Sequence, residues 1–94
     1  MVKVVKQVEK SGGKYLKIEL EVVSGIIRDL KVSGDFFAYP PYLLDNLERG
    51  AKGMRADPSE VDKLLSRYIG RLELVGISIE DLRGLIVNSL REAK

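Results

Sequence analysis

The 94-residue sequence contains no cysteine and no histidine. Without thiols and imidazoles there are no disulfides, no zinc or iron–sulfur sites built on these ligands, and no histidine titrating near neutral pH. Cysteine–histidine nucleophilic catalysis is excluded on the same ground, and no serine stands beside an evident base. Stability must therefore come from a hydrophobic core.

Long apolar runs are also missing. No stretch of the sequence approaches the roughly 20 apolar residues that a helix needs to cross a bilayer. Lys3 and Lys6 interrupt the only apolar segment near Met1, so no signal peptide is predicted there. We therefore expect a cytoplasmic protein that does not enter a membrane.

Strong net charge is absent too, because the total is only +2. Residues 1–33 carry seven Lys or Arg against four Asp or Glu, whereas residues 34–94 carry nine against ten. A basic first third favours an acidic partner or a nucleotide phosphate, but lysines on solvated strand edges explain the same count, and we prefer that explanation.

The first third of the chain shows the two-residue alternation of β-strands. The alternation is complete over residues 15–22 and partial over residues 26–33, and it recurs over residues 2–8. Short Gly-containing turns separate these segments, so we expect an antiparallel meander. The apolar positions of the first two strands are Val2, Val4 and Val8, and Leu16, Ile18, Leu20 and Val22.

The remaining two thirds predict three helices. Pro41 suits the first turn of a short helix that closes near Gly50. Residues 57–60 open a second helix, with Asp57 as the cap, and that helix ends at Gly70. Residues 78–81 open the last helix with a similar start signal.

Two further features complete the predicted fold. Residues 71–77 form an apolar connector that fits an extended conformation, and Gly84 inside the last helix is expected to permit close helix–sheet contact. Segregated strands and helices indicate the α+β class. We predict a single domain over residues 1–94, a three-stranded antiparallel meander covered on one face by two to three helices (β-β-β-α-α-α).

The most unusual segment is the Gly-Asp-Phe-Phe motif, which comprises Gly34, Asp35, Phe36 and Phe37. Four of the six aromatic residues lie between residues 36 and 42. Gly34 permits positive φ or a close backbone approach, and Asp35 can accept hydrogen bonds from the following turn. Two interpretations stay open, and they are compatible. The Phe pair closes the end of the core, or one Phe and Tyr39 stay exposed as a contact patch.

Two other clusters are candidates for chemistry. Gly12, Gly13 and Lys14 can present backbone amides and an ammonium group to a phosphate, although a hairpin turn with an exposed lysine explains them too. The acidic residues at positions 57, 60 and 62 suggest a magnesium site. Acids in the first turn of a helix also oppose the helix dipole favourably, so we predict neither a metal site nor a catalytic residue in this chain.

Taken in order, these motifs resemble the C-terminal accessory domain of lipoate-protein ligases. The resemblance spans essentially the whole chain, and its most specific part is the Gly-Asp-Phe-Phe motif with the upstream hairpin. The stretch 38–41 varies among such domains, so no ligand contact is assigned to Tyr39. The matching segments are residues 12–14, 25–27, 32–37, 46–53 and 76–82.

The resemblance implies a non-catalytic accessory subunit of a two-component ligase. A large catalytic subunit would bind ATP, Mg²⁺ and lipoate, form lipoyl-AMP, and transfer the lipoyl group to a lysine of an acceptor domain. This chain would bind no cofactor alone and would support the adenylate-forming step as part of a heterodimer. Residues 34–37 would face the partner or its pocket, with residues 12–14 beside them near a phosphate. A chain that begins directly at the first strand is expected to be the free-standing form.

Two other functions stay open from the residues themselves. One is a nucleic-acid-binding module on the basic strands, but the order of elements lacks a helix between the first two strands and the charge is low, so no nucleic-acid partner is expected. The other is a homo-oligomer held together by the Phe and Tyr residues.

Overall fold

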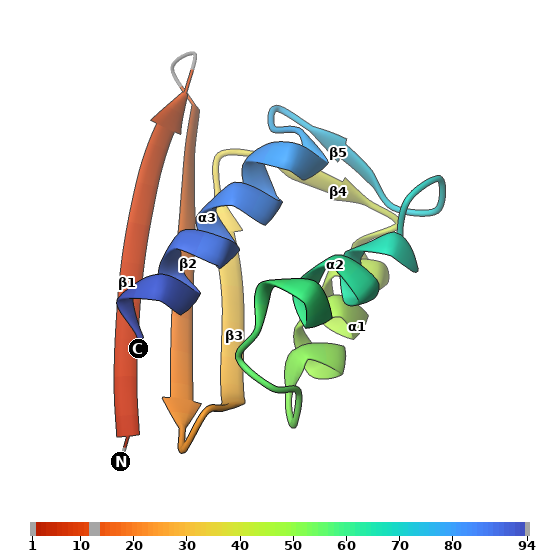
Figure 1. Ribbon diagram of the computed structural model, residues 1–94. Helices are drawn as coiled ribbons and strands as arrows, with labels where there is room; N and C mark the ends of the chain where they lie inside the picture. The colour runs from red at the N-terminus through yellow and green to blue at the C-terminus, as the bar shows by residue number, and fades with distance from the viewer. Residues whose placement is uncertain (1, 12–13, 94) are drawn as a thin grey trace.

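The computed structural model describes residues 2–11 and 14–93 of the chain. Its main sheet contains β1 (Val2–Ser11), β2 (Lys14–Val23) and β3 (Ile26–Gly34), which pair antiparallel in the order β1-β2-β3 (Figure 1). The predicted α+β class and the three-stranded meander are confirmed.

Five further elements follow the meander: β4 (Phe37–Tyr39), α1 (Pro41–Ala51), α2 (Pro58–Ser66), β5 (Glu73–Val75) and α3 (Ile79–Glu92). The extended conformation predicted within residues 71–77 is confirmed over β5, whereas no sequence pattern predicted β4. These two short strands pair antiparallel and form a second, two-stranded sheet at one end of the molecule (Figure 1).

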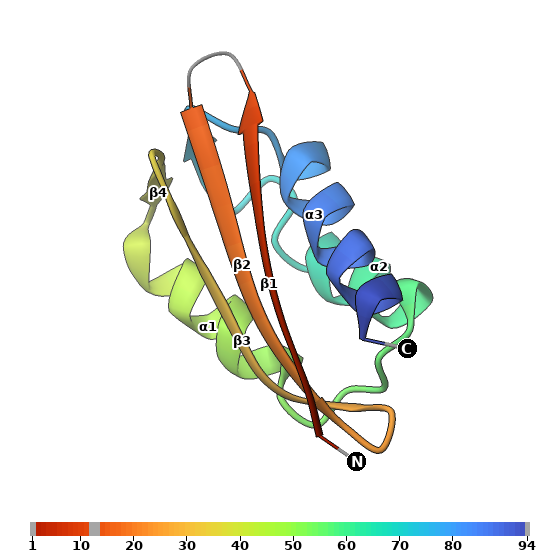
Figure 2. The ribbon, with the colours of Figure 1, turned by 90° about the vertical axis from the view of Figure 1, so that its left-hand side faces the viewer.

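Helices α2 and α3 lie on one side of the main sheet, and α1 lies along its β3 edge (Figure 2). Helix α3 crosses β1 and β2, with α2 beside it, and in the described part of the chain no helix covers the other face of these strands (Figure 2). Helix α1 lies along β3, where Glu48 accepts a hydrogen bond from the backbone N–H of Val32 at 2.7 Å. The outer edge of β3 is therefore closed by α1, whereas β1 forms the other edge of the sheet.

The core lies between the sheet and the helices. The alternation of β2 places its apolar side chains toward the helices, as the sequence predicts, and apolar stripes on α1, α2 and α3 meet them. None of the helices in residues 2–11 and 14–93 is long and apolar enough to cross a membrane. Among the described residues, the largest fully buried side chains are Ile18, Leu20, Ile27, Leu30, Leu47, Val61, Leu82, Ile86, Ser89 and Leu90.

Two valines of β1, Val2 and Val4, lie on the uncovered face of the sheet. Val4 pairs with Glu21 and is 63 % exposed, while Lys3 pairs with Val22, whose side chain is buried toward the helices. Directly opposite residues share a face, so the alternation of Val2 and Val4, which is typical of a half-buried strand, does not mark the face that the helices cover. Positions 4 and 5 are both valine, and the alternation therefore could not decide which face is covered.

A bulge explains why the alternation of β3 is only partial. Glu21 pairs with Asp29 and Val22 with Ile27, so Arg28 is an extra residue on β3. The extra residue shifts the side-chain alternation by one position. Ile27 and Leu30 both enter the core as a result, although they are three residues apart.

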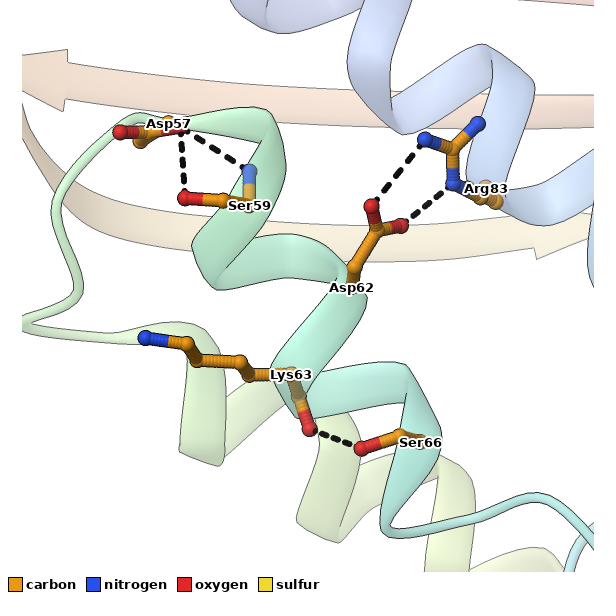
Figure 3. Close-up of polar contacts among 6 residues, drawn as sticks. All are labelled: Asp57, Ser59, Asp62, Lys63, Ser66 and Arg83. Carbon is orange, nitrogen blue, oxygen red and sulfur yellow. Dashed lines mark hydrogen bonds and ion pairs between the residues drawn. The ribbon is translucent and has the colours of Figure 1, made fainter.

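The helix starts follow the predicted caps. Asp57 accepts hydrogen bonds from the backbone N–H and the hydroxyl of Ser59, at 2.9 and 3.0 Å (Figure 3). Ser78 and Asp81 form a reciprocal capping box at the start of α3. Helix α2 ends at Ser66, four residues before the predicted end, because residues 67–72 form turns.

Gly84 does not have the predicted role. Among the described residues beyond its own helix backbone, a Cβ added at this position would meet no atom within 4 Å, so no close contact with the described part of the sheet depends on the glycine.

Candidate functional site

Gly34 holds the end of β3 against the start of β2. Its φ is +147°, and a Cβ there would overlap the carbonyl oxygen of Tyr15 and lie 3.0 Å from the Cα of Leu16. The backbone N–H of Asp35 donates to the same Tyr15 oxygen at 2.9 Å. The predicted need for glycine at this position is confirmed, since both the backbone angle and the close approach exclude a side chain.

The two Phe residues point in different directions. Phe36 is half-buried and packs against the core, whereas Phe37 is 66 % exposed. Phe36 therefore closes the end of the core and Phe37 stays exposed, while the contact role of Phe37 stays a prediction. Asp35 is exposed, and its carboxylate makes no hydrogen bond among the described residues, so the predicted capping of the following turn by Asp35 is wrong.

The pairing of β4 with β5 places aromatic and aliphatic side chains side by side on the outside of the molecule. Phe37 pairs with Val75, and Tyr39 pairs with Glu73. The central pair, Ala38 and Leu74, packs against the core. We call the exposed side chains of Phe37, Tyr39 and Val75 the aromatic face.

Gly76 lets the end of β5 pack closely against the Gly-Asp-Phe-Phe motif, a role that the sequence did not predict. Its φ is +104°, and a Cβ there would lie 3.1 Å from the carbonyl oxygen of Asp35 and 3.5 Å from the Cα of Phe36. The contact joins segments about 40 residues apart in the sequence. The only sequence signal was the apolar connector after residue 70, which gave no sign of its pairing partner.

Two grooves flank the segment that joins β4 to α1. The first, of about 410 Å³, lies between β3, β4 and the start of α1, and the motif forms one wall. The second, of about 640 Å³, lies between Tyr39 and the turn before β5, and includes Arg71. The first groove is lined by Val32, Ser33, Gly34, Phe36, Phe37, Ala38, Pro41, Leu44 and Asp45.

The second predicted site lies mostly outside the described residues. Gly12 and Gly13 are not among them, and the side chain of Lys14 is not described either. The backbone of Lys14 begins β2 directly before Tyr15, whose carbonyl accepts the Asp35 N–H. The predicted neighbourhood of Lys14 and the motif is therefore seen in the backbone, and the phosphate contact stays a prediction.

The acidic residues at the start of α2 have structural partners. Asp62 accepts hydrogen bonds from Arg83 of α3, including one of 3.1 Å from Nη2 to Oδ2 (Figure 3). The hydrogen bond from Arg83 holds the pKa of Asp62 below its ordinary value of 3.8, although partial desolvation opposes the shift. Glu60 lies 3.7 Å from the ammonium of Lys63. Among the described residues, no group of three or more Asp or Glu is placed to hold a metal ion.

A family model described as bacterial lipoate protein ligase C-terminus matches residues 4–86, which include every element but the last turns of α3. The chain belongs to this family. The resemblance drawn from the motifs is thus confirmed. No curated protein matches the sequence of this lipoate protein ligase C-terminal domain.

A solved structure shares the fold of the domain. It comes from a structural analysis of an archaeal lipoylation system, a bi-partite lipoate protein ligase and its E2 lipoyl domain from Thermoplasma acidophilum. The superposition gives a TM-score of 0.80 and covers 92 % of this chain and 97 % of that chain, with 21 % sequence identity. The two chains therefore have the same fold over nearly their whole lengths.

Proposed function

We propose that this chain is a non-catalytic accessory subunit of a two-component lipoate-protein ligase that acts in the cytoplasm. It forms a heterodimer with a large catalytic subunit and supports the ATP-dependent conversion of lipoate to lipoyl-AMP. The observation that carries the proposal is the family match over residues 4–86. The similarity in fold and extent to a chain of a bi-partite lipoate protein ligase supports the split arrangement.

The reaction explains what an accessory subunit contributes. A carboxylate oxygen of lipoate attacks the α-phosphorus of ATP, and pyrophosphate leaves. The amine of an acceptor lysine then attacks the acyl carbon of lipoyl-AMP and releases AMP. ATP, Mg²⁺ and lipoate bind to the large subunit in this proposal. The first step gains from closure of the site, because closure orients the reactants and excludes the water that hydrolyses the adenylate.

The accessory chain acts as a lid that completes the closed state. The Gly-Asp-Phe-Phe motif supports this role because it forms one wall of a groove and presents Phe37 to the outside. Its position is fixed by the close contacts of Gly34 and Gly76. A rigid edge of this kind can dock against a partner without losing much conformational entropy.

The test separates adenylate formation from lipoyl transfer. The large subunit is incubated with an acceptor domain and either lipoate plus ATP and Mg²⁺, or preformed lipoyl-AMP, and lipoylation is followed by mass spectrometry. We expect the reaction from lipoate and ATP to require this chain, and the reaction from lipoyl-AMP to proceed without it. Equal lipoylation from lipoate and ATP with and without the chain would contradict the proposal.

A further inference from the structure

We propose that the aromatic face is the surface through which this chain docks on the catalytic subunit, an inference that rests on the proposed function. Phe37, Tyr39 and Val75 are 66 %, 53 % and 46 % exposed. Phe37 and Val75 are directly opposite each other in the β4–β5 pair, and Tyr39 is two residues from Phe37 on the same face. Two aromatic rings and a valine exposed side by side mark a contact surface, and aromatic side chains are enriched at such surfaces.

The aromatic face is held in place before any partner binds. Ala38 of β4 and Leu74 of β5 pack against the core on the opposite side of the small sheet and hold its strands in place. The motif before β4 is bonded to β2 through Tyr15, and Gly76 after β5 lies against the motif. Side chains on such a fixed backbone lose less entropy on binding than side chains on a free loop.

Two grooves lie beside the aromatic face, and side chains of a partner could fill them. The groove of about 410 Å³ includes Phe37 itself, and the groove of about 640 Å³ includes Tyr39 together with Arg71. Tyr and Arg are among the residue types that most often dominate the binding energy of protein interfaces, and they do so mainly in well-packed pockets.

The catalytic subunit is the occupant that these features favour. Three partly exposed side chains present only a few hundred Å², less than the roughly 800 Å² that each partner of a stable complex buries. An occupant must therefore also fill the grooves, one of which is walled by the Gly-Asp-Phe-Phe motif. Because this chain shares its fold with a chain of a bi-partite lipoate protein ligase, the other component of such a ligase is the partner that the proposed function supplies for this surface.

A second exposed apolar row exists on the uncovered face of the main sheet and serves as an internal control. Val2, Val23 and Ile26 are opposite one another across β1, β2 and β3, and Val4 lies next to this row. Val4 is as exposed as Phe37, at 63 %. This row has no aromatic residue and lies at the opposite end of the sheet from Gly34.

The test compares equally exposed residues on the two surfaces. Phe37→Ser, Val75→Ser and Val4→Ser chains are titrated into the large subunit, and the dissociation constants are measured by calorimetry. Thermal melts of each chain check its fold, which these exposed positions should preserve. We expect Phe37→Ser to weaken binding about tenfold or more, Val75→Ser to weaken it several-fold, and Val4→Ser to change it less than about twofold, as interface cores and distant surfaces do.

The outcomes distinguish the docking surface from the proposed function. Normal binding by Phe37→Ser and Val75→Ser, while the wild-type chain still binds and supports lipoylation, would overturn the docking surface alone. A wild-type chain that does not bind the large subunit would overturn both. If light scattering shows a homodimer of the wild-type chain that Phe37→Ser disrupts, and binding to the large subunit is unchanged, the aromatic face joins two copies and the inference is wrong.

Discussion

Gly34 adopts a φ of +147° at the end of β3, and a Cβ there would overlap the carbonyl oxygen of Tyr15. Gly34→Ala should therefore destabilise the fold by about 1–3 kcal/mol, the cost of a side chain in this backbone region, with the overlap adding to it. Urea denaturation followed by circular dichroism measures the change.

Gly84 provides the matched control at the residue scale. It lies inside α3, where an added Cβ would meet no described residue beyond its own helix backbone within 4 Å. Gly84→Ala should stabilise the fold by about 0.5–1 kcal/mol, because alanine loses less backbone entropy in a helix. Equal effects of the two substitutions would show that the contact with Tyr15 does not constrain position 34.

Single residues were predictable where the local sequence sets their environment. The need for glycine at position 34 followed from its place at the end of a strand. One buried and one exposed Phe was among the open interpretations, but the sequence did not predict that Phe37 is the exposed one. The role of Gly76 did not, because its neighbour is Asp35, a residue far away in the sequence. Hydrogen bonding by the Asp35 side chain was predicted from residue type alone, and the structure does not show it.

At the scale of elements, the capping box of α3 is a direct test of the helix starts. The Ser78 hydroxyl accepts from the Asp81 N–H at 3.0 Å, and Asp81 bonds back to the Ser78 N–H at 3.1 Å. Ser78→Ala should lower the free energy of unfolding by about 0.5–2 kcal/mol, because the backbone N–H of Asp81 loses its acceptor at the start of the helix. Ser66→Ala, at an exposed serine that ends α2, should change it by less than about 0.5 kcal/mol. If urea denaturation shows similar losses of unfolding free energy for both variants, the hydroxyl of Ser78 does not stabilise α3 as a cap.

The link between α2 and α3 predicts a dependence on pH. Arg83 lowers the pKa of Asp62 below 3.8, so the ionised carboxylate is favoured in the folded state. The stabilisation is fully present above pH 3.8 and is lost as the pH falls through the lower pKa of the folded state. Arg83→Gln should lower the melting temperature slightly at neutral pH, and the difference from wild type should disappear in acid and shrink in about 1 M salt.

An exposed arginine outside this pair is the control for that measurement. Arg67 lies just after α2 and is exposed. Arg67→Gln should leave the melting temperature nearly unchanged over the same pH range, because most isolated surface charges contribute little. A difference between wild type and Arg83→Gln that persists unchanged into acid would show that packing, and not the ion pair, joins the helices.

The elements with strong periodicity or clear caps were predictable, and those defined by distant pairing were not. The alternation of β2 and the start signals at Asp57 and Ser78 led to correct strands and helices. The sequence could not predict which face of β1 the helices cover, because valine occupies both odd and even positions in this strand. The bulge at Arg28 and the three-residue β4 depend on neighbouring strands, whose positions only the folded chain supplies.

At the scale of the whole molecule, the structure divides into a conventional two-layer body and a small sheet that carries the candidate site. The body follows from the segregation of strands and helices in the sequence, and the family match covers it from residue 4 to residue 86. The small sheet could not be predicted from local sequence patterns, because β4 and β5 pair with each other across two intervening helices. The pairing of β4 with β5 forms the aromatic face.

The most direct measurement of the central claim is a titration of this chain into a fixed amount of the large subunit, with lipoate-dependent release of pyrophosphate from ATP as the signal. The account predicts no release by this chain alone and a rise to a plateau at one chain per large subunit. Phe37→Ser should reach the same plateau only at higher concentration. Release by the large subunit that does not depend on the amount of chain added would contradict the account.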